Sequence, residues 1–532
     1  MWTVNSIDDA RQLLSAGICS LTTDDPGTIL AALKNRIKPA EQLSLRRHSC
    51  NDSLSVVTTS NCLCRNNRML NPEAATSRRT FLSSSLAVTG ATIGLKAVPL
   101  HAQNNRSAND SVTILNPRNR VPLSFIIDDS TCLVNMGHFC MPQFAECYPS
   151  RKDYQKPWKT WPREIPDSFV REFGEWCAEH GVKGKYSIVP NPACVGWMDR
   201  EIPGWSRREL LDSLKLVREL MVPNWDIHPE MITHTRVINL KTGRPINEIS
   251  PATMENSYPQ ENKSVDELAA YLAYSLRILK NCDLPCEGVT TPGGFGNLVK
   301  PELSLAVHDA VRDVFGSELP HYFKYVIGSG ESTMPKLEHV RDLNTNDPKV
   351  TVNVPAGTGD WFGGWDGDRE SEPDRYATED AASGRMVEMI EQGEPAVMLC
   401  HWPGMYTQGT KAGFRAFQRV VTSLAVRYRN KTVWMKVSQI GRYYAAAELT
   451  KITATPDRIS LNAPFGTSGF TLRIAKPATG RPIIRTASGE SQTLDELGSI
   501  ADIDSGKWLN EESSQVLCFD LPKGSTTISW AA

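Results

Sequence analysis

The alternation of strand-like and helix-like segments between residues 111 and 447 is the feature that most constrains the fold. Short apolar runs such as Val121–Ile127 alternate with longer amphipathic segments such as Arg207–Met221. Repeated strand–helix–strand units place their strands parallel in one sheet and cover that sheet with helices. The pattern therefore predicts an α/β domain over residues 111–447.

The periodicity of the apolar residues places the other expected elements of the chain. We expect helices at Ile165–His180, from Ser264 onwards, near Ala381–Glu391 and at Gly413–Tyr428, and strands at Lys185–Val189, Trp225–Leu240, Tyr322–Ile327, Val350–Val354, Ala396–Cys400 and Val433–Val437. Beyond residue 447, short β-type segments separated by Gly, Pro, Asn and Asp predict a small all-β, sandwich-like domain over residues 448–532. Carbohydrate binding and packing against the α/β domain are both open roles for this domain.

A twin-arginine signature stands at Ser77–Leu82, in the order Ser-Arg-Arg-Thr-Phe-Leu. An apolar stretch follows as far as Leu100, and Ala102 is a small residue suited to cleavage. Because this stretch contains Lys96, Pro99 and several Ser and Thr, it is too polar for a transmembrane helix. We therefore predict a twin-arginine signal peptide over residues 69–102 and export to the periplasm or the medium.

Residues 1–68 precede this signal and are rich in Ser, Asn and Arg, without sustained periodicity. Twin-arginine signals normally begin close to the initiator, and Met69 would be a conventional start. We therefore expect residues 1–68 to be a disordered extension or the product of an upstream start codon that is rarely used.

The composition is that of an ordinary soluble protein, with 40% hydrophobic and 22% charged residues. A formal net charge of -2 gives no electrostatic reason to expect nucleic acid or an anionic membrane as a partner, and we expect no membrane span in the mature chain. Of the 13 cysteines, nine follow the signal, and Cys282 and Cys286 could bridge in an oxidising compartment.

Two adjacent carboxylates, Asp128 and Asp129, end the first strand of the α/β domain. In parallel α/β barrels the catalytic groups gather at the carboxyl ends of the strands. Neighbouring carboxylates are costly to bury together unless a cation, a proton or solvent relieves their repulsion. Either both carboxylates belong to a catalytic or cation-binding site, or one aspartate is a helix N-cap and the other is solvated.

The segment Trp225–Thr235 carries three side chains that suit a metal ion, His228, Glu230 and His234. If the segment is extended, the two-residue period of a strand puts all three on one face. Imidazole nitrogens and carboxylate oxygens are ligands for Zn²⁺ and similar ions. Near the Asp128-Asp129 strand end, this segment predicts a divalent metal site, with zinc as the expected ion; the alternative is that each histidine only packs in the core.

The loop Gly288–Asn297 contains glycines that let the backbone approach a ligand closely. Its candidate substrate contacts are Thr291, Pro292 and Gly293, and the alternative is an ordinary connecting loop. After the apolar run Ala396–Cys400 comes His401, whose imidazole can exchange protons near neutral pH.

Several tryptophans are surplus to an obvious core pattern, and two of them, Trp361 and Trp402, are candidate substrate contacts. An indole ring can stack on the apolar face of a sugar, but a tryptophan is as often a core or rim residue. Both interpretations stay open for each ring.

In chain order, these segments resemble the motifs of the NodB-type polysaccharide deacetylases, a family of carbohydrate esterases. The Ser-Phe-Ile-Ile-Asp-Asp run at Ser124–Asp129 looks like the family's Thr-Phe-Asp-Asp motif, and Leu399–His401 looks like its Leu-x-His motif. Ile165–Val189 resembles the family's helix and following strand, and Val433–Tyr444 resembles the end of its barrel. The resemblance implies an α/β fold, a (β/α) barrel of polysaccharide-deacetylase type over residues 111–447, with the small all-β domain at its C-terminus.

The resemblance also implies roles for individual residues. Asp128 corresponds to the catalytic base, Asp129 to a metal ligand and His401 to the general acid. Aligning Trp225–Ile227 with the family's Trp-Glu-Ile puts Glu230 and His234 at the two metal-binding histidines, with His228 as an extra candidate. A Glu in place of His keeps an oxygen ligand for the metal. Asp360 matches loosely the aspartate that orients the acid histidine.

The family's Arg-x-Pro motif, whose arginine braces the base, corresponds here to Thr290-Thr291-Pro292. Threonine can donate a hydrogen bond but cannot supply a fixed positive charge. Either another cation holds Asp128 or the chemistry differs from that of the family.

The sequence thus predicts a metal-dependent hydrolase that deacetylates a substituted glycan or small carbohydrate. One alternative is a glycoside hydrolase or lyase on a similar barrel that uses carboxylates such as Asp128, Glu230 and Asp360. The other is a non-catalytic, carbohydrate-binding envelope protein that kept the fold and lost the arginine-dependent chemistry.

Overall fold

The computed structural model describes residues 111–475, 477 and 479–531, together with three strands nearer the N-terminus. These strands form an antiparallel sheet in the order β1-β3-β2, with bounds β1 (Ser20–Thr23), β2 (Gln42–Arg47) and β3 (Leu54–Thr59). They belong to a compact unit, Met1–Thr92, that is separate from the unit Ile93–Ala532. The predicted extension over 1–68 is otherwise outside the described residues, as is the predicted signal peptide over 69–102, and both stay predictions.

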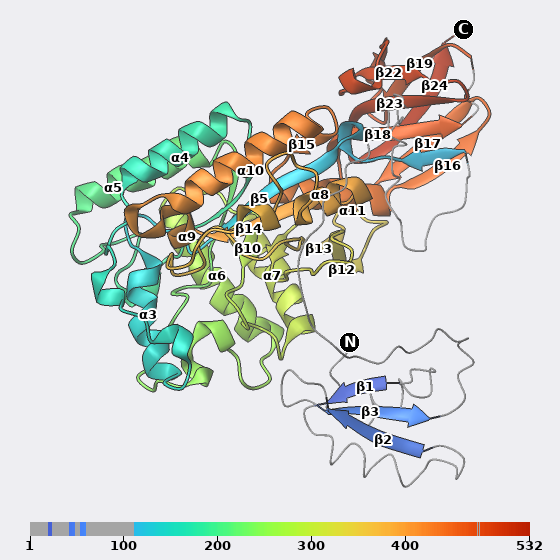
Figure 1. The fold of residues 1–532 in the computed structure, drawn as a ribbon. Helices are drawn as coiled ribbons and strands as arrows, with labels where there is room; N and C mark the ends of the chain where they lie inside the picture. The colour runs from blue at the N-terminus through green and yellow to red at the C-terminus, as the bar shows by residue number, and fades with distance from the viewer. Residues whose placement is uncertain are drawn as a thin grey trace. The chain divides into compact units, whose positions relative to one another are not determined.

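The second unit begins with a mixed α/β region, as the sequence predicts (Figure 1). One parallel sheet has the order β14-β5-β6-β7, and β15 also pairs with β5. Its strands are β5 (Val121–Asp128), β6 (Gly184–Ser187), β7 (Trp225–His228), β14 (Ala396–His401) and β15 (Thr432–Trp434). Every residue of β5 is buried, which explains why the strand is mostly apolar.

A second sheet has the order β10-β11-β13-β12, in which only β12 is antiparallel. Its strands are β10 (Gly288–Thr290), β11 (His321–Phe323), β12 (Lys336–Arg341) and β13 (Lys349–Asn353). The two sheets meet at one isolated bridge between Glu230 and Thr290, and at one hydrogen bond of 2.9 Å from the Gly357 N–H to the Val397 carbonyl. The described strands therefore do not form the single closed ladder of the predicted barrel.

Strand β7 ends at His228, and the chain leaves the extended conformation after Glu230, which still forms the isolated bridge to Thr290. Met231 and His234 have φ values of 51° and 65°, in the left-handed region, which a strand cannot contain. The predicted strand over Trp225–Leu240 is therefore wrong beyond His228: a loop follows β7, and only the short hairpin β8 (Ile238–Asn239) and β9 (Arg244–Pro245) is extended later.

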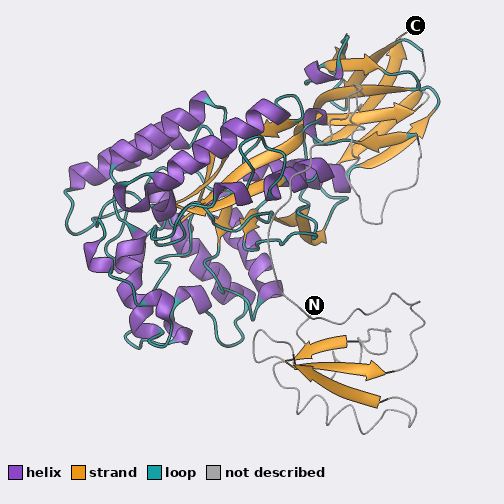
Figure 2. Ribbon diagram, viewed as in Figure 1, coloured by secondary structure: helices purple, strands orange, loops and turns teal. Residues whose placement is uncertain are grey.

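Helices surround these strands (Figure 2). They are α3 (Met136–Cys147), α4 (Asp167–Glu179), α5 (Arg207–Leu216), α6 (Val265–Asn281), α7 (Lys300–Phe315), α8 (Arg385–Gln392), α9 (Trp402–Tyr406), α10 (Ala412–Tyr428) and α11 (Val437–Leu449). Helix α5 begins with a capping box, in which Ser206 and Glu209 satisfy each other's backbone N–H groups, and α6 begins in the same way at Ser264. These local signals explain why both helix starts could be predicted.

The C-terminal region consists of two five-stranded sheets, in agreement with the predicted all-β domain. One sheet has the order β16-β17-β24-β19-β20 and the other β21-β22-β23-β18-β4. Their strands are β4 (Val112–Ile114), β16 (Lys451–Thr455), β17 (Arg458–Ala463), β18 (Thr467–Ala475), β19 (Arg481–Thr486), β20 (Ser491–Thr493), β21 (Asp495–Glu496), β22 (Lys507–Asn510), β23 (Ser514–Leu521) and β24 (Gly524–Ala531). Strand β4 comes from the start of the predicted α/β domain, so this β region is built from both ends of the unit.

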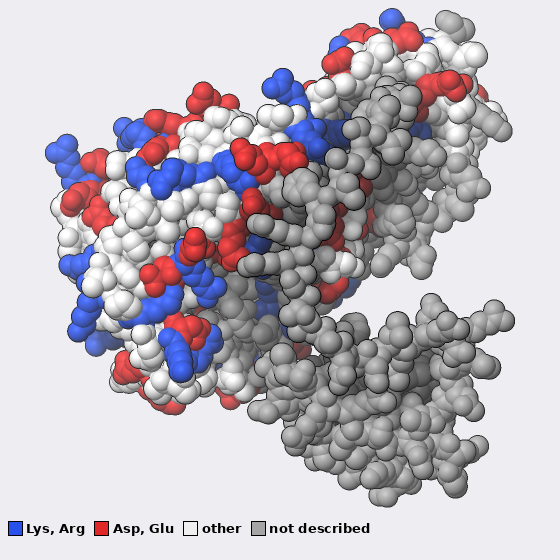
Figure 3. All heavy atoms as spheres, viewed as in Figure 1, with Lys and Arg blue, Asp and Glu red and all other residues white. Residues whose placement is uncertain are grey.

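Acidic and basic side chains are interspersed on the face of the molecule seen in Figure 3. All nine described cysteines are free thiols, including the buried pair Cys282 and Cys286. Among the described residues, no helix combines the length and apolar character needed to span a bilayer.

Candidate metal centre

The two carboxylates at the end of β5 are both buried, and they differ in their surroundings. Asp128 is the last residue of the strand, and Asp129 turns away from it with a φ of 56°. The Asp129 side chain is 1% exposed, and neither of its oxygens accepts a hydrogen bond in the described structure. A buried carboxylate without hydrogen bonds is strongly unfavourable unless a positive charge lies against it.

Glu230 and His234 reach Asp129 from the loop that follows β7. His234 Nε2 lies 3.0 Å from Asp129 Oδ1 and 3.5 Å from Glu230 Oε1. The Asp129 N–H donates to Glu230 Oε2 at 2.8 Å. One oxygen or nitrogen from each of the three residues lies within 4.8 Å of the others, and all three are buried. Asp129, Glu230 and His234 were all predicted as metal ligands, and in the structure they lie side by side.

The electrostatics of this cluster favour a cation. Burial acts to lower the pKa of His234, but the Asp129 and Glu230 carboxylates outweigh it and raise the pKa well above its ordinary value. Burial likewise acts to raise the pKa of Glu230, but His234 outweighs it and the pKa falls to about 2. Two buried carboxylates therefore flank one buried imidazole, where a divalent cation can replace the proton on His234.

The donor set fits a divalent cation such as zinc. Two carboxylate oxygens and one imidazole nitrogen are borderline-hard ligands, and catalytic zinc sites commonly use three protein ligands with a further position left for water or substrate. The buried Asp129 carboxylate supports this fit, because Oδ2 accepts no hydrogen bond and Oδ1 has only His234 Nε2, at 3.0 Å, as a polar contact among the described residues. Asp129, Glu230 and His234 form the only such group found among the described residues.

His228, predicted as a further metal ligand, lies elsewhere. Its Nε2 is 2.9 Å from Nε2 of His321 on β11, and its Nδ1 is 3.3 Å from the Thr290 hydroxyl. Both imidazoles are almost completely buried, and burial lowers the pKa of His228 well below its ordinary value. The prediction fails because the chain turns at Met231, whose φ is 51°, so His228 and His234 do not share a strand face.

A buried lysine holds Asp128. Lys185, in the middle of β6, is 0% exposed, and its ammonium group contacts Asp128 Oδ1. The same nitrogen donates to the Ser187 hydroxyl at 2.8 Å and to the Ile127 carbonyl at 3.2 Å. The positive charge that Thr290-Thr291-Pro292 cannot supply therefore comes from the neighbouring strand.

The pKa of Asp128 reflects this crowded position. Burial and the nearby Glu230 carboxylate raise it, Lys185 and His401 lower it, and the net result is a pKa of about 6. A carboxyl group of this kind is mostly ionised at neutral pH and can still accept a proton there. Lys185 engages Oδ1, which leaves Oδ2 as the oxygen available to a reacting group.

His401 stands at the end of β14, in register with Asp128 on β5. Its Nδ1 lies 2.8 Å from Asp360 Oδ2, and the same oxygen accepts the His401 backbone N–H at 3.2 Å. Burial acts to lower the pKa of His401, but Asp360 outweighs it and raises the pKa to about 9. The loose sequence match of Asp360 thus corresponds to a direct contact that fixes the imidazole.

Glu255, which the sequence analysis did not single out, anchors the loop that carries His234. Its carboxylate accepts the backbone N–H groups of Ile232, Thr233 and His234, at 3.2, 2.8 and 2.5 Å. The Tyr271 hydroxyl also donates to it. Burial is the main reason why the pKa of Glu255 is raised to about 7. A buried carboxylate with several backbone donors holds a loop in one conformation, although no local motif in the sequence reveals it.

We expect Glu255→Ala to weaken zinc binding by roughly 10- to 100-fold, the range typical of residues that orient metal ligands. The loop from Ile232 to His234 loses three hydrogen bonds in this variant, and His234 loses its fixed position. The measurement is a competition titration with a coloured zinc chelator. Glu248→Ala, an exposed change on the same connection, is the control and should leave the affinity unchanged. Equal affinities for wild type and Glu255→Ala would show that the loop does not need this anchor.

The predicted substrate contacts differ from one another in exposure. Thr291 and Pro292 are buried, and the Thr291 hydroxyl has no hydrogen-bond partner in the described structure; Gly293 is exposed. Trp361 is half-buried between Tyr376, with ring centroids 4.9 Å apart, and the Arg375 guanidinium, 4.2 Å from its ring.

Trp402 is a core residue and not a substrate contact. Its ring is 0% exposed and packs on Phe169, Phe173 and Tyr186, at centroid distances of 4.9, 5.2 and 5.4 Å. A sugar ring cannot reach an indole that is enclosed in this way. Trp402 is the first residue of the short helix α9, with Pro403 in its first turn, which the tryptophan pattern alone could not show.

Aromatic residues pack beside the Asp129, Glu230 and His234 cluster, and of these Trp365 is only half-buried. The Phe144 ring lies 6.1 Å from the His234 ring and packs against the half-buried Trp365 at 5.5 Å. Tyr154 packs on Phe144 and Trp365, at 5.1 and 5.9 Å. This group lies beside the metal centre because α3 carries Phe144.

Comparisons with known proteins leave the family of this chain undetermined. No protein-family model matches it, and no curated protein matches it. A mutant of a CE4-family pseudoenzyme with restored enzymatic activity aligns with 61% of this chain and 68% of its own, at 13% identity and a TM-score of 0.26. A protein described as a glycoside hydrolase/deacetylase, from Parabacteroides distasonis, aligns with 71% of this chain and 85% of its own, at 10% identity and a TM-score of 0.32.

The α-fucosidase of Thermotoga maritima, in complex with fucose, aligns with 77% of this chain and 96% of its own, at 11% identity and a TM-score of 0.27. These neighbours include deacetylase-like and glycosidase proteins. At such TM-scores they assign no activity to this chain, so the function has to be inferred from its own site.

Proposed function

We propose that the chain is a metal-dependent hydrolase that removes acetyl groups from a substituted glycan. The observation that carries the proposal is the convergence of Asp129, Glu230 and His234 beside a lysine-held Asp128 and an aspartate-held His401. The glycan as substrate is supported by the resemblance of the Ser124–Asp129 and Leu399–His401 motifs to those of the polysaccharide deacetylases.

Asp129, Glu230 and His234 would hold the cation. A bound divalent cation supplies Lewis acidity, which lowers the pKa of a water molecule and polarises an acyl oxygen. Asp128, the residue next to Asp129, takes the proton from the attacking water at Oδ2 while Lys185 fixes its other oxygen. His401, whose Nδ1 is held by Asp360, delivers a proton from Nε2 to the leaving amine or alkoxide.

Three contacts favour this hydrolase over the alternatives from the sequence. The non-catalytic alternative depended on a missing cation beside Asp128, and Lys185 supplies that cation. The glycosidase alternative used carboxylates such as Asp128, Glu230 and Asp360. Of these, Asp128 is paired with Lys185, Glu230 Oε1 lies 3.5 Å from His234 Nε2, and Asp360 accepts both the ring and the backbone N–H of His401.

The rate of deacetylation should follow a bell-shaped pH profile. Asp128 must be deprotonated to act as the base, so activity rises as pH increases through a value at or below about 6, since a bound cation lowers the pKa further. His401 must be protonated to act as the acid, so activity falls as pH increases through about 9. Asp360→Asn should move the alkaline limb to lower pH, because the carboxylate that raises the pKa of His401 is lost. An unchanged alkaline limb in Asp360→Asn would remove His401 from the proposed role.

The direct test is acetate release from N-acetylglucosamine oligomers and from O-acetylated xylan. Protein stripped with a chelator should be inactive on both, and added zinc should restore activity on at least one. Wild type and His401→Ala should bind equal amounts of zinc, while only wild type releases acetate. Zinc-loaded wild-type protein that releases no acetate from either polymer would contradict the deacetylase assignment, and unchanged activity in the stripped protein would contradict the metal dependence.

A further inference from the structure

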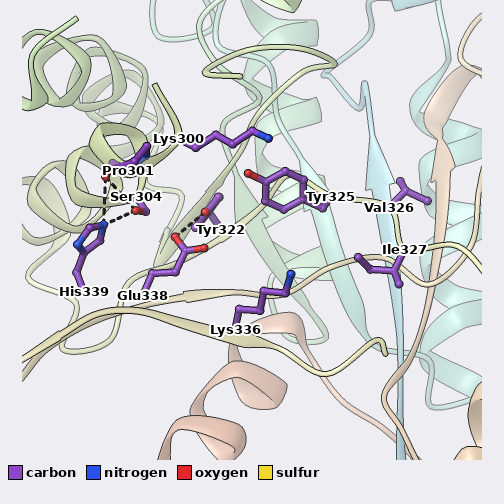
Figure 4. Close-up of a pocket in the computed structure, with 10 residues that line it drawn as sticks. All are labelled: Lys300, Pro301, Ser304, Tyr322, Tyr325, Val326, Ile327, Lys336, Glu338 and His339. Atoms are coloured by element: carbon purple, nitrogen blue, oxygen red, sulfur yellow. Dashed lines mark hydrogen bonds between the residues drawn. The ribbon is translucent and has the colours of Figure 1, made fainter. Parts of the chain in front are cut away.

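A cavity of about 630 Å³ opens on the second sheet, among residues that the metal centre does not use. It lies between the start of α7, the segment after β11 and strand β12 (Figure 4). Its volume is within the range of small-molecule binding pockets. Some of its wall comes from Tyr322, whose hydroxyl donates to Glu338 at 2.8 Å.

The cavity is on the opposite face of the sheet from the buried histidine pair. Successive residues of a strand point to opposite faces. His321 contacts His228 on the inner face, and its neighbour Tyr322 therefore points outward to the cavity. The cavity is separated from that interior by strand β11 itself.

One side of the cavity is positively charged. Lys300 of α7 and Lys336 of β12 are both exposed, and Figure 4 shows their ammonium ends on the side where the Tyr325 ring lies. Lys300 Nζ lies 5.6 Å from the centroid of this ring, and Nζ of the buried Lys324 lies 5.7 Å from it. Lys324 also donates to the Phe295 carbonyl.

Lys300, Lys324 and Lys336 have no carboxylate partner within ion-pair distance in the part of the chain that the structure describes. Burial, and after it the charge of Lys300, lower the pKa of Lys324 to about 8, but Lys324 does not line the cavity. An anion placed between Lys300 and Lys336, which do line it, would be favoured by charge-assisted hydrogen bonds.

The other side of the cavity can bind hydroxyl groups. The Glu338 carboxylate accepts from Tyr322 at Oε2, which leaves Oε1 as an acceptor for a further hydroxyl, whereas His339 Nε2 is already engaged by the Ser304 hydroxyl at 2.6 Å and the Pro301 carbonyl at 3.1 Å. A carboxylate at this side disfavours a second anionic group and favours hydroxyl donors. The partly buried Tyr325 ring offers a flat apolar surface between the two sides.

We propose that this cavity binds an acidic sugar, a hydroxylated ring that bears one carboxylate. The carboxylate meets Lys300 and Lys336, the ring face lies against Tyr325, and a hydroxyl group donates to Glu338. This inference is independent of the metal centre and of the deacetylase proposal.

Calorimetric titration of the full chain with glucuronate, and with glucose as the uncharged probe of the same ring, tests the inference. We expect glucuronate to bind at least about ten-fold more tightly than glucose, and its binding to weaken as sodium chloride is raised. The double variant Lys300→Ala/Lys336→Ala should weaken glucuronate binding at least about ten-fold, and Tyr325→Ala should weaken it as well. Lys215→Ala, an exposed lysine of α5, is the matched control and should bind as wild type does.

Three results would overturn the inference: equal affinities for glucuronate and glucose, no detectable binding of either, or full binding by the double variant. Asp129→Asn distinguishes this cavity from the metal centre, since it should bind glucuronate normally. Loss of binding in Asp129→Asn, with binding kept in the double variant, would place the sugar at the metal centre instead. Circular dichroism melting of each variant shows whether it is folded, and Tyr325→Phe, which keeps the ring, should retain binding.

Discussion

Asp129→Asn is expected to lower the rate of acetate release by roughly 10³-fold or more, equivalent to about 4 kcal/mol of transition-state stabilisation. Asp129 contributes a buried carboxylate whose two oxygens accept no hydrogen bond in the described structure. The amide of asparagine has nearly the same shape but no negative charge, so the variant should fold and fail to hold the cation. Steady-state kinetics and metal content measured on the same samples check both parts of the prediction.

A stability measurement gives a readout besides activity. Zinc at 100 times its Kd should stabilise the wild-type protein by about 2.7 kcal/mol, because it binds only the folded chain. The same zinc concentration should not stabilise Asp129→Asn. Asp368→Asn, which changes an exposed aspartate paired with Lys156, is the control and should behave as wild type does. A zinc-dependent stabilisation of equal size in Asp129→Asn would remove this residue from the ligand set.

Lys185→Met is expected to lower the free energy of unfolding by about 3–5 kcal/mol at pH 8, the usual cost of removing one partner from a buried ion pair. Lys185 is fully buried, and its loss leaves the Asp128 carboxylate charged with no cation against it. The deficit should shrink as pH falls, because the protonated carboxyl is neutral and needs no partner. Chemical denaturation at several pH values measures this dependence.

The double variant Lys185→Met/Asp128→Asn is the control for the loss of the ion pair. Removing the charge of Asp128 should restore most of the lost stability at pH 8, because no unpaired charge stays buried. Lys183→Met, a change at a half-buried lysine two residues earlier, should cost less than Lys185→Met. If the double variant is as unstable as Lys185→Met, the cost comes from packing rather than from the ion pair. In the single variant, zinc content should be kept while the acid limb of the pH profile moves upward.

Much of the architecture follows from local sequence signals. Strand β5 could be predicted because its apolar run is buried along its whole length, and the starts of α5 and α6 because each has a capping box. The closed barrel could not be predicted or excluded in this way, since it depends on hydrogen bonds between distant strands. Positive φ values at Met231 and His234 break the ladder after β7, and neither residue signals such a conformation from its type.

Some residues of the candidate site could be predicted from the sequence, and others could not. Asp129, Glu230, His234 and His401 were found because strand ends gather at one edge of parallel sheets and because their motifs resemble a known family. His228 was misplaced because an extended course was assumed beyond the true end of β7. Lys185 was missed although a lysine inside a buried strand is unusual, and that signal could have identified the partner of Asp128.

X-ray diffraction recorded at the zinc absorption edge, from crystals grown with zinc, tests the central claim most directly. We predict one strong anomalous peak with oxygen or nitrogen atoms of Asp129, Glu230 and His234 at about 2.0–2.2 Å. A peak bound by His228 and His321 instead, or no zinc peak near Asp129, would contradict the metal centre and with it the proposed hydrolase.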